Sequence, residues 1–226
     1  MTRPAYPRVP HLAPGPGITR DDLVLSKDAR ERLLGGRVHI EEKLDGANLS
    51  FALCDGRVDV ATRGGLGAID RGGHLGRARS WAAEHSDDLR GLLADGWILY
   101  GEWLLTRHGV GYDSLPDLLV GLDLFDPKTG WLPVHARDER LCQTGVAIPH
   151  ALGEFDGADL DAIDALIGPS TFGAPLVEGL IVRALDARAD VPRLAKRLAN
   201  GVPRVTDRAF GRAREQNHVA RPAMRA

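Results

Sequence analysis

Three strand-like runs follow one another between residues 37 and 63, and a charged stretch separates the first run from the second. Residues 37–40 are typical of a strand. Residues 47–53 alternate up to a turn at Asp55-Gly56, and residues 57–63 alternate again. Short alternating strands joined by tight turns favour antiparallel pairing. We therefore expect a sheet that presents the charged stretch, residues 41–48, where two strands meet.

The charged stretch is Glu-Glu-Lys-Leu-Asp-Gly-Ala-Asn and contains Lys43, one of only four lysines against 25 arginines in the chain. One interpretation makes Lys43 a solvated residue at a strand edge, where lysine discourages further pairing. The other makes it a nucleophile whose amine is deprotonated by burial and by nearby positive charge. Arginine cannot replace lysine in that second role, because guanidinium does not lose its proton near neutral pH.

The rest of the chain predicts an α+β domain of largely antiparallel sheets with inserted and flanking helices. A Pro/Gly-rich arm, residues 1–20, precedes a domain of residues 21–200 and a basic tail or helical extension, residues 201–226. We expect helices from Asp21 or Asp22 to Leu34, at 77–93, 137–144 and 158–167, and in part from Thr206; further strands are expected at 97–105, 117–125 and 176–183.

Two carboxylates stand inside otherwise apolar strands, and each precedes a glycine: Glu102 and Glu178. A carboxylate is costly to bury unless it meets a cation, a metal or hydroxyl groups, so both are candidate site residues. His108 and Tyr112 lie in a loop and are interpreted as packing residues. The glycines between residues 64 and 76 are interpreted as a plain loop, because no Gly-Lys-Ser/Thr follows them.

Composition narrows the class of protein without naming an activity. The 226 residues carry a formal charge of -2 and are 43% hydrophobic, which is ordinary for one or two globular domains. From Arg183 onward, eleven Lys or Arg face four acids, so this basic tail is suited to contact a polyanion. Two isolated cysteines, no membrane-spanning apolar run and no signal-peptide core predict a cytoplasmic protein.

Together these residues are the parts that nucleotidyl transfer to an amine requires. The chain resembles the covalent nucleotidyltransferases, and it is most similar to ATP-dependent RNA ligases of the phage double-strand-sealing type and their bacterial relatives. The resemblance rests on four motifs in the family's order: Lys43-Leu44-Asp45-Gly46, Tyr100-Gly101-Glu102, Leu124-Phe125-Asp126 and Glu178-Gly179-Leu180-Ile181-Val182-Arg183.

The resemblance implies a role for each matching position. Lys43 is the nucleophile that becomes lysyl-AMP, and Glu42 contacts adenine through its backbone. Asn48 and Arg63 lie near the AMP phosphate or the RNA end. Glu102 holds the ribose, Phe125 stacks on adenine, and Lys196 contacts the α-phosphate. Glu178 binds the metal or orders the lysine, and Glu102 and Glu178 are the candidate ligands for Mg²⁺ or Mn²⁺.

One motif departs from the family pattern. The family pairs two basic residues two positions apart near Lys196, but position 198 is Leu198. Arg183, Arg193 and Arg197 are the candidates for the missing phosphate cation. About thirty residues follow Lys196, too few for the OB fold of DNA ligases and capping enzymes. We therefore expect either a minimal ligase or one that relies on an RNA-repair partner protein.

The resemblance implies an ATP-dependent RNA ligase that joins a 3′-hydroxyl to a 5′-phosphate through lysyl-AMP and a 5′-adenylated strand. Two alternatives stay open. One is a DNA-sealing ligase or another nucleotidyltransferase of the superfamily. The other is a binding module for nucleotide or nucleic acid that has the fold without the reaction.

Overall fold

The structure, a computed structural model, describes residues 3–15, 18–63, 74–186, 188–202 and 215–220, apart from the side chain of His74. Its contacts divide the chain into two compact units that interleave along the sequence. Unit 1 comprises Met1–Pro7, Gly46–Leu105 and Leu118–Ile148, and unit 2 comprises Arg8–Asp45, Thr106–Asp117 and Pro149–Ala226. The chain passes from unit 2 to unit 1 between Asp45 and Gly46, inside the charged stretch.

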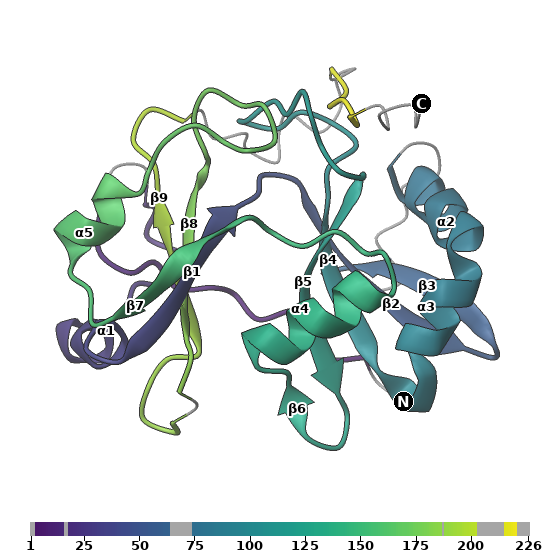
Figure 1. Cartoon of the computed structure of the whole chain (residues 1–226), viewed down its shortest axis with the longest axis horizontal. Helices are drawn as coiled ribbons and strands as arrows, with labels where there is room; N and C mark the ends of the chain where they lie inside the picture. The colour runs from purple at the N-terminus through teal and green to yellow at the C-terminus, as the bar shows by residue number, and fades with distance from the viewer. Residues whose placement is uncertain (1–2, 16–17, 64–73, 187, 203–214, 221–226) are drawn as a thin grey trace. The chain divides into compact units, whose positions relative to one another are not determined.

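Unit 1 is built on a five-stranded antiparallel sheet with the order β3-β2-β4-β5-β6 (Figure 1). Its strands are β2 (Ala47–Cys54), β3 (Arg57–Thr62), β4 (Ile98–Trp103), β5 (Leu119–Asp126) and β6 (Gly130–Trp131). Its helices are α2 (His74–Glu84), α3 (Ser86–Leu92), the 3₁₀ turn η1 (Ala94–Gly96) and α4 (Val134–Gln143).

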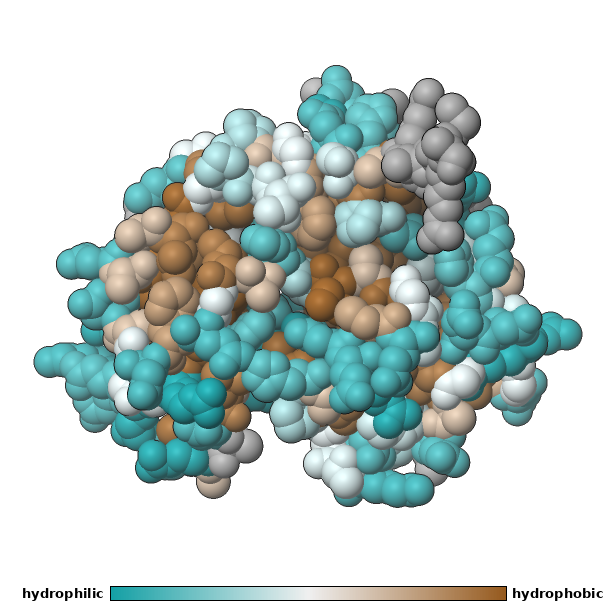
Figure 2. Space-filling model, viewed as in Figure 1, coloured by the Kyte–Doolittle hydropathy of each residue, from teal (hydrophilic) through white to brown (hydrophobic). Residues whose placement is uncertain are grey.

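Alternation along these strands separates an apolar face from a polar one. Phe51, Leu99 and Trp103 point into a core shared with the helices, where Trp81 of α2 and Leu141 of α4 are also buried. The outward side of α4 is hydrophilic (Figure 2). The residues between the core positions, including Asn48, Ser50, Tyr100 and Glu102, therefore face the opposite side of the sheet.

The N-terminal arm packs on unit 1 through Tyr6, whose hydroxyl donates to Oδ2 of buried Asp123 at 2.5 Å. Arg3 contributes an ion pair with Asp59 at 2.9 Å. Proline-rich segments cannot form helices or central strands, so their order depends on such contacts with the folded body. The first part of the arm, residues 3–7, is thus held by side-chain contacts rather than by regular secondary structure.

Unit 2 is built on a four-stranded antiparallel sheet with the order β7-β1-β8-β9. Its strands are β1 (Arg37–Lys43), β7 (Ala151–Asp156), β8 (Gly179–Ala184) and β9 (Leu194–Leu198). Helices α1 (Lys27–Leu34) and α5 (Leu160–Ala165) accompany them. The backbone of residues 10–12 pairs with Lys196 and so extends the sheet beyond β9.

The two faces of this sheet differ sharply in polarity. Ile40 and Val182 are buried with Leu33 of α1 and Ile163 of α5 in an apolar core. Residues of the opposite parity face the other side, and the ionisable ones among them include His39, Glu41 and Lys43 on β1, Arg183 on β8 and Lys196 on β9. Unit 2 therefore presents a row of charged groups on one face of its sheet.

The two antiparallel sheets and few helices confirm the expected fold class, but several boundaries were wrong. Helix α1 begins at Lys27, because the Ser26 hydroxyl accepts the Ala29 N–H, whereas Asp22 accepts from Thr19 in a turn. The expected helix at 77–93 is divided into α2 and α3 at His85.

Strand β7 was not expected, because Gly153 weakens its pattern and only pairing with β1 makes it a strand. The expected helix from Thr206 falls on residues 203–214, outside those described. Within the described part of the chain, no helix has the length and apolarity to cross a membrane.

Candidate active site

Lys43 is the last residue of β1, and its ammonium contacts the carboxylate of Glu178. The Nζ atom lies 2.5 Å from Oε2 of Glu178 and also donates to the carbonyl of Leu44 at 3.2 Å. The side chains of Lys43 and Glu178 are 21% and 18% exposed. The amine is thus held by a carboxylate yet is open enough for a reagent to reach it.

Burial raises the pKa of Glu178 above its ordinary value, while the positive charges of Lys43 and Lys196 act in the opposite direction. The nearby charge of Asp45 adds to the rise. The charges of Lys43, Asp45 and Lys196 therefore all act on Glu178. These four residues of unit 2 come from three separate segments of the chain.

Strand register explains how these groups meet. Lys43 pairs with Gly179 on β8, and Gly179 pairs with Leu198 on β9, so these positions form one row across the sheet. A Cβ at Gly179 would collide with the backbone of Arg197 and Leu198. Glycine at the first position of β8 therefore permits the close approach of β9, which carries Lys196.

Both residues before Lys43 have polar partners. Arg183 donates to Glu41 at 2.6 Å, and both side chains are almost fully buried. Ser170 donates to Glu42 at 2.5 Å on the opposite face, where burial raises the pKa of Glu42. Such paired contacts fix the backbone that leads to Lys43, because buried charges without partners would be costly.

Asp45, two residues after Lys43, is held by a loop of unit 2. Its Oδ2 accepts the backbone N–H groups of Gly109 and Val110 at 2.5 and 2.9 Å. Its own N–H donates to the hydroxyl of Tyr112 at 2.9 Å. Tyr112 was interpreted as a packing residue, and its link to Asp45 was missed because no local pattern signals a contact across 67 residues.

In unit 1, Asn48 on β2 and Glu102 on β4 are cross-strand partners on the polar face of the sheet. Glu102 Oε1 accepts the backbone N–H of Gly46 at 3.0 Å. The Nδ2 atom of Asn48 is buried and has no hydrogen-bond partner among the described residues. A buried donor without a partner is costly, which is what a position that receives a ligand oxygen would show before binding.

The other two predicted residues of unit 1 are Phe125 and Arg63. Phe125 is the second-last residue of β5, and its ring meets that of Trp131 edge-on with centroids 5.1 Å apart. It pairs with Ile98, so it lies four residues from Glu102 along β4, roughly 13 Å at the usual strand rise. Arg63 is exposed in a turn at the end of the described range 18–63.

The three candidate phosphate cations differ in placement. Arg197 lies on the opposite face of β9 from Lys196, and its guanidinium makes two 2.6 Å hydrogen bonds to Asp164 of α5. Arg193 directly precedes β9, and its carbonyl accepts from Ala184. Of the three, Arg183 shares the face of Lys43, where it is bonded to Glu41.

Among the described residues, no group of three or more His, Cys, Asp or Glu side chains could hold a metal ion unaided. Carboxylate oxygens suit Mg²⁺, which commonly binds one or two carboxylates together with water and substrate phosphates. Glu178, and separately Glu102 in unit 1, supply that kind of ligand. The donor chemistry therefore fits a metal that arrives with nucleotide.

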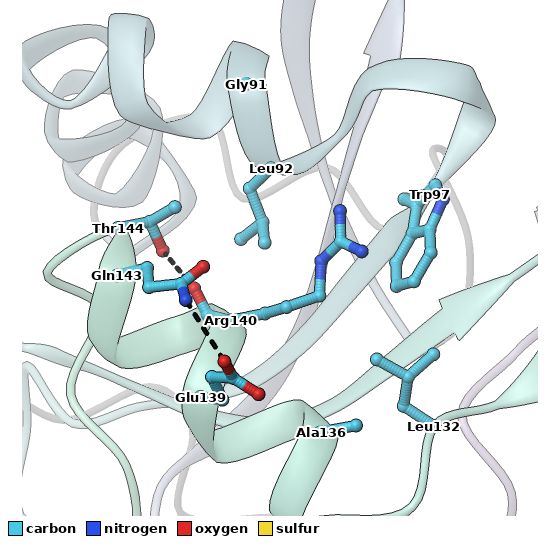
Figure 3. Close-up of a pocket in the computed structure, with 9 residues that line it drawn as sticks. All are labelled: Gly91, Leu92, Trp97, Leu132, Ala136, Glu139, Arg140, Gln143 and Thr144. Carbon is cyan, nitrogen blue, oxygen red and sulfur yellow. Dashed lines mark hydrogen bonds between the residues drawn. The ribbon is translucent and has the colours of Figure 1, made fainter.

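A pocket of about 670 Å³ occupies another part of unit 1, between helices α3 and α4 (Figure 3). The Arg140 guanidinium lies over the Trp97 ring, 4.0 Å from its centroid, and Leu92 lines the same hollow. Helices α3 and α4 cover the apolar face of the sheet, whereas Glu102 is on the polar face. This pocket is thus distinct from the predicted nucleotide-binding residues.

Comparison with known proteins bears on this arrangement. The family model described as RNA ligase matches residues 36–198, a stretch that contains Lys43, Glu102, Glu178 and Lys196. The chain belongs to the RNA ligase family. No match is found among curated proteins.

Solved RNA ligase structures show the same fold. A mutant of the Naegleria gruberi RNA ligase with ATP and Mn aligns with a TM-score of 0.57 and 19% identity over 75% of this chain and 52% of that one. A second mutant, with AMP and Mn, aligns with a TM-score of 0.57 and 20% identity over 75% of this chain and 52% of that one. The Naegleria gruberi ligase with pyrophosphate aligns with a TM-score of 0.59 and 19% identity over 88% of this chain and 62% of that one. This RNA ligase family member therefore spans between 52% and 62% of those chains.

Proposed function

We propose that this chain is an ATP-dependent RNA ligase that first transfers AMP to Lys43. In this step Nζ attacks the α-phosphorus of ATP, a phosphoramide bond forms, and the bond to pyrophosphate breaks. The observation that carries the proposal is the 2.5 Å contact between Lys43 Nζ and Glu178 inside the matched family region. The ATP and pyrophosphate bound to the Naegleria gruberi ligase support the choice of nucleotide.

Glu178 has a direct task in this reaction. The Lys43 ammonium must lose a proton before its nitrogen can attack, and Glu178 Oε2 is within reach to accept it. Because burial raises its pKa, the Glu178 carboxylate is a stronger base than an exposed glutamate. The same contact orients Nζ before nucleotide binds.

The other roles rest on the match to the family motifs and on the placement of individual side chains. Asn48 donates its unpartnered Nδ2 hydrogens to a phosphate or RNA oxygen, and Glu102 binds the ribose. Phe125 stacks on adenine and Arg63 approaches the RNA end, both by resemblance alone. Lys196 contacts the α-phosphate, and the backbone of Glu42 contacts adenine.

Arg183 is a better candidate than Arg197 for the second phosphate cation, because it shares the face of Lys43. A divalent metal held by Glu178 or Glu102 and the ATP phosphates would neutralise charge on the phosphate oxygens. The remaining steps pass AMP from Lys43 to an RNA 5′-phosphate. The RNA 3′-hydroxyl then attacks that phosphorus, which forms the phosphodiester and releases AMP.

Labelling with α-³²P-ATP and Mg²⁺ tests the first step. We expect label on the wild type, no label on Lys43→Ala and full label on Lys27→Ala, a control at an exposed lysine of α1. Failure of the folded wild type to take up label would overturn the proposal. Label on Lys43→Ala would move the nucleophile elsewhere.

A substrate comparison separates the alternatives. Nicked duplexes with RNA or DNA at the 3′-hydroxyl strand should be sealed unequally, in favour of RNA. Equal sealing would favour a general polynucleotide ligase, and ATP binding without an adduct would favour a non-catalytic module. Repetition with the four nucleotides identifies the donor.

The setting of the enzyme is part of the same proposal. The exposed free thiols of Cys54 and Cys142 accord with a reducing cytoplasm. The basic tail is proposed to contact RNA phosphates, so RNA affinity should fall steeply as salt rises. Co-purification of an RNA-repair protein with the chain would test for the expected partner.

A further inference from the structure

The loop that holds Asp45 is itself held by a segment close to the C-terminus. Residues 106–115 run alongside residues 215–220, with bridges between Thr106 and Gln216 and between Leu115 and Val219. The Leu115 N–H donates to the carbonyl of His218 at 2.9 Å. We refer to residues 215–220 as the C-terminal clamp.

Tyr112 contacts the C-terminal clamp through both of its backbone polar groups. Its N–H donates to Oδ1 of buried Asn217 at 2.8 Å, and its carbonyl accepts the N–H of His218 at 2.9 Å. Its ring is fully buried against Phe172, with centroids 6.5 Å apart. Both backbone groups, the ring and the hydroxyl of Tyr112 are therefore engaged, the hydroxyl with Asp45.

A continuous series of contacts thus runs from Asn217 to the residue two positions after Lys43. Asn217 fixes the backbone of Tyr112, the Tyr112 hydroxyl fixes the N–H of Asp45, and two loop amides fix the Asp45 carboxylate. All of these residues belong to unit 2. The backbone at Asp45 cannot shift without breaking several partly buried hydrogen bonds, each of which is costly to lose without a replacement.

We infer that Asn217 and Tyr112 are positioning residues for the adenylylation of Lys43, an inference that rests on the proposed function. The clamp holds Nζ on the line of attack, so its loss slows the chemical step while ATP binding is preserved. A displacement of about 1 Å at a reacting atom can cost about 10²-fold in rate. The clamp gives residues 215–220 a task that composition alone does not reveal.

The experiment compares full-length Asn217→Ala and Tyr112→Phe with wild type and with Gln216→Ala. Gln216 is an exposed neighbour whose bridge to Thr106 is made by backbone, so its variant is a matched control. Single-turnover labelling with α-³²P-ATP over a range of ATP concentrations separates the rate constant from the apparent Kd. Hydrogen exchange of peptides covering residues 106–115 reports on the loop without requiring activity.

We expect Asn217→Ala and Tyr112→Phe to lower the adenylylation rate constant by about 10-fold to 100-fold, with the apparent Kd for ATP changed less than about threefold. Asn217→Ala should also speed exchange in residues 106–115, and Gln216→Ala should match wild type in every readout. Tyr112→Phe keeps the ring packing, so it decides the matter if Asn217→Ala unfolds.

Three outcomes would overturn the inference. These are unchanged rate constants in both variants, a loss confined to ATP affinity, or a Gln216→Ala variant as slow as Asn217→Ala. A wild type that takes up no label contradicts the proposed function itself. In that case unchanged hydrogen exchange in Asn217→Ala would separately contradict the clamp.

Discussion

Lys43 Nζ lies 2.5 Å from Oε2 of Glu178, although 135 residues separate the two in the chain. The contact joins the end of β1 to the residue that precedes β8, and antiparallel pairing of Lys43 with Gly179 makes it possible. The proposed nucleophile and its proposed base are thereby held together by the hydrogen bonds of a sheet, which is a rigid support.

The pH dependence of adenylylation should reflect Glu178. Its pKa is raised by burial, so its carboxylate takes up a proton at a pH above 4.5, the ordinary value. As the pH falls through this raised pKa, Glu178 loses its charge and can no longer accept the Lys43 proton. The rate at saturating ATP should therefore fall on the acid side.

Single-turnover labelling across pH measures this dependence. Glu178→Gln cannot accept the proton at any pH, so its residual rate should be low and should lack this acid limb. A wild-type rate that stays level down to pH 4.5 would show that protonation of Glu178 does not limit the reaction.

Asn48→Ala should weaken ATP use without destabilising the free protein. The buried Nδ2 of Asn48 lacks a partner among the described residues, so its removal costs the folded state no hydrogen bond from that atom. A hydrogen bond to a charged phosphate contributes about 1.5–3 kcal/mol, which predicts a fall in kcat/KM for ATP of roughly 10-fold to 150-fold.

Steady-state kinetics and thermal melting check the Asn48 prediction. The melting temperature should equal or exceed that of wild type. A lower melting temperature with unchanged kcat/KM would assign Asn48 to the fold rather than to the ligand.

Substitutions of two adjacent cationic residues, Lys196 and Arg197, should have different effects, one on adenylylation and the other on the free energy of unfolding. Lys196 shares the face of Lys43, so Lys196→Ala should reduce adenylylation about 10-fold or more, because charged contacts to phosphate are strong. Arg197 pairs with partly exposed Asp164, so Arg197→Ala should lower the free energy of unfolding by about 1 kcal/mol at most. Urea unfolding and labelling of both variants distinguish the two roles. The reverse pattern would place Arg197 at the phosphate.

Leu198→Lys should supply the cation that the family pattern expects. Leu198 lies in the same row as Lys43 and Gly179, so an ammonium there would approach a bound phosphate. Coulomb attraction of about 1 kcal/mol at a partly exposed site predicts a fall in KM for ATP of roughly fivefold. Leu198→Met is the matched control of similar size. An equal KM in both variants would indicate that another group already neutralises the phosphate.

The sequence by itself predicted the fold class, which the structure confirms, and it supplied the candidate residues for the chemistry. Glu102 and Glu178 stand out because each is a charged group in an apolar strand, and Lys43 stands out as a scarce lysine in a charged stretch between two strands. Both are local properties of the sequence. The short alternating runs likewise predict antiparallel strands, because side-chain alternation has a period of two along any strand.

Tertiary structure decided which distant groups meet. The side of β9 that Arg197 faces depends on register, and a shift of one residue would exchange Arg197 with Lys196. The contacts of Tyr112 with Asp45 and Asn217 span 67 and 105 residues. Such pairings follow from long-range packing, so no short stretch of sequence specifies them. Lys43 could be identified as the candidate nucleophile from its motif, but the groups that hold it could be identified only from the folded chain.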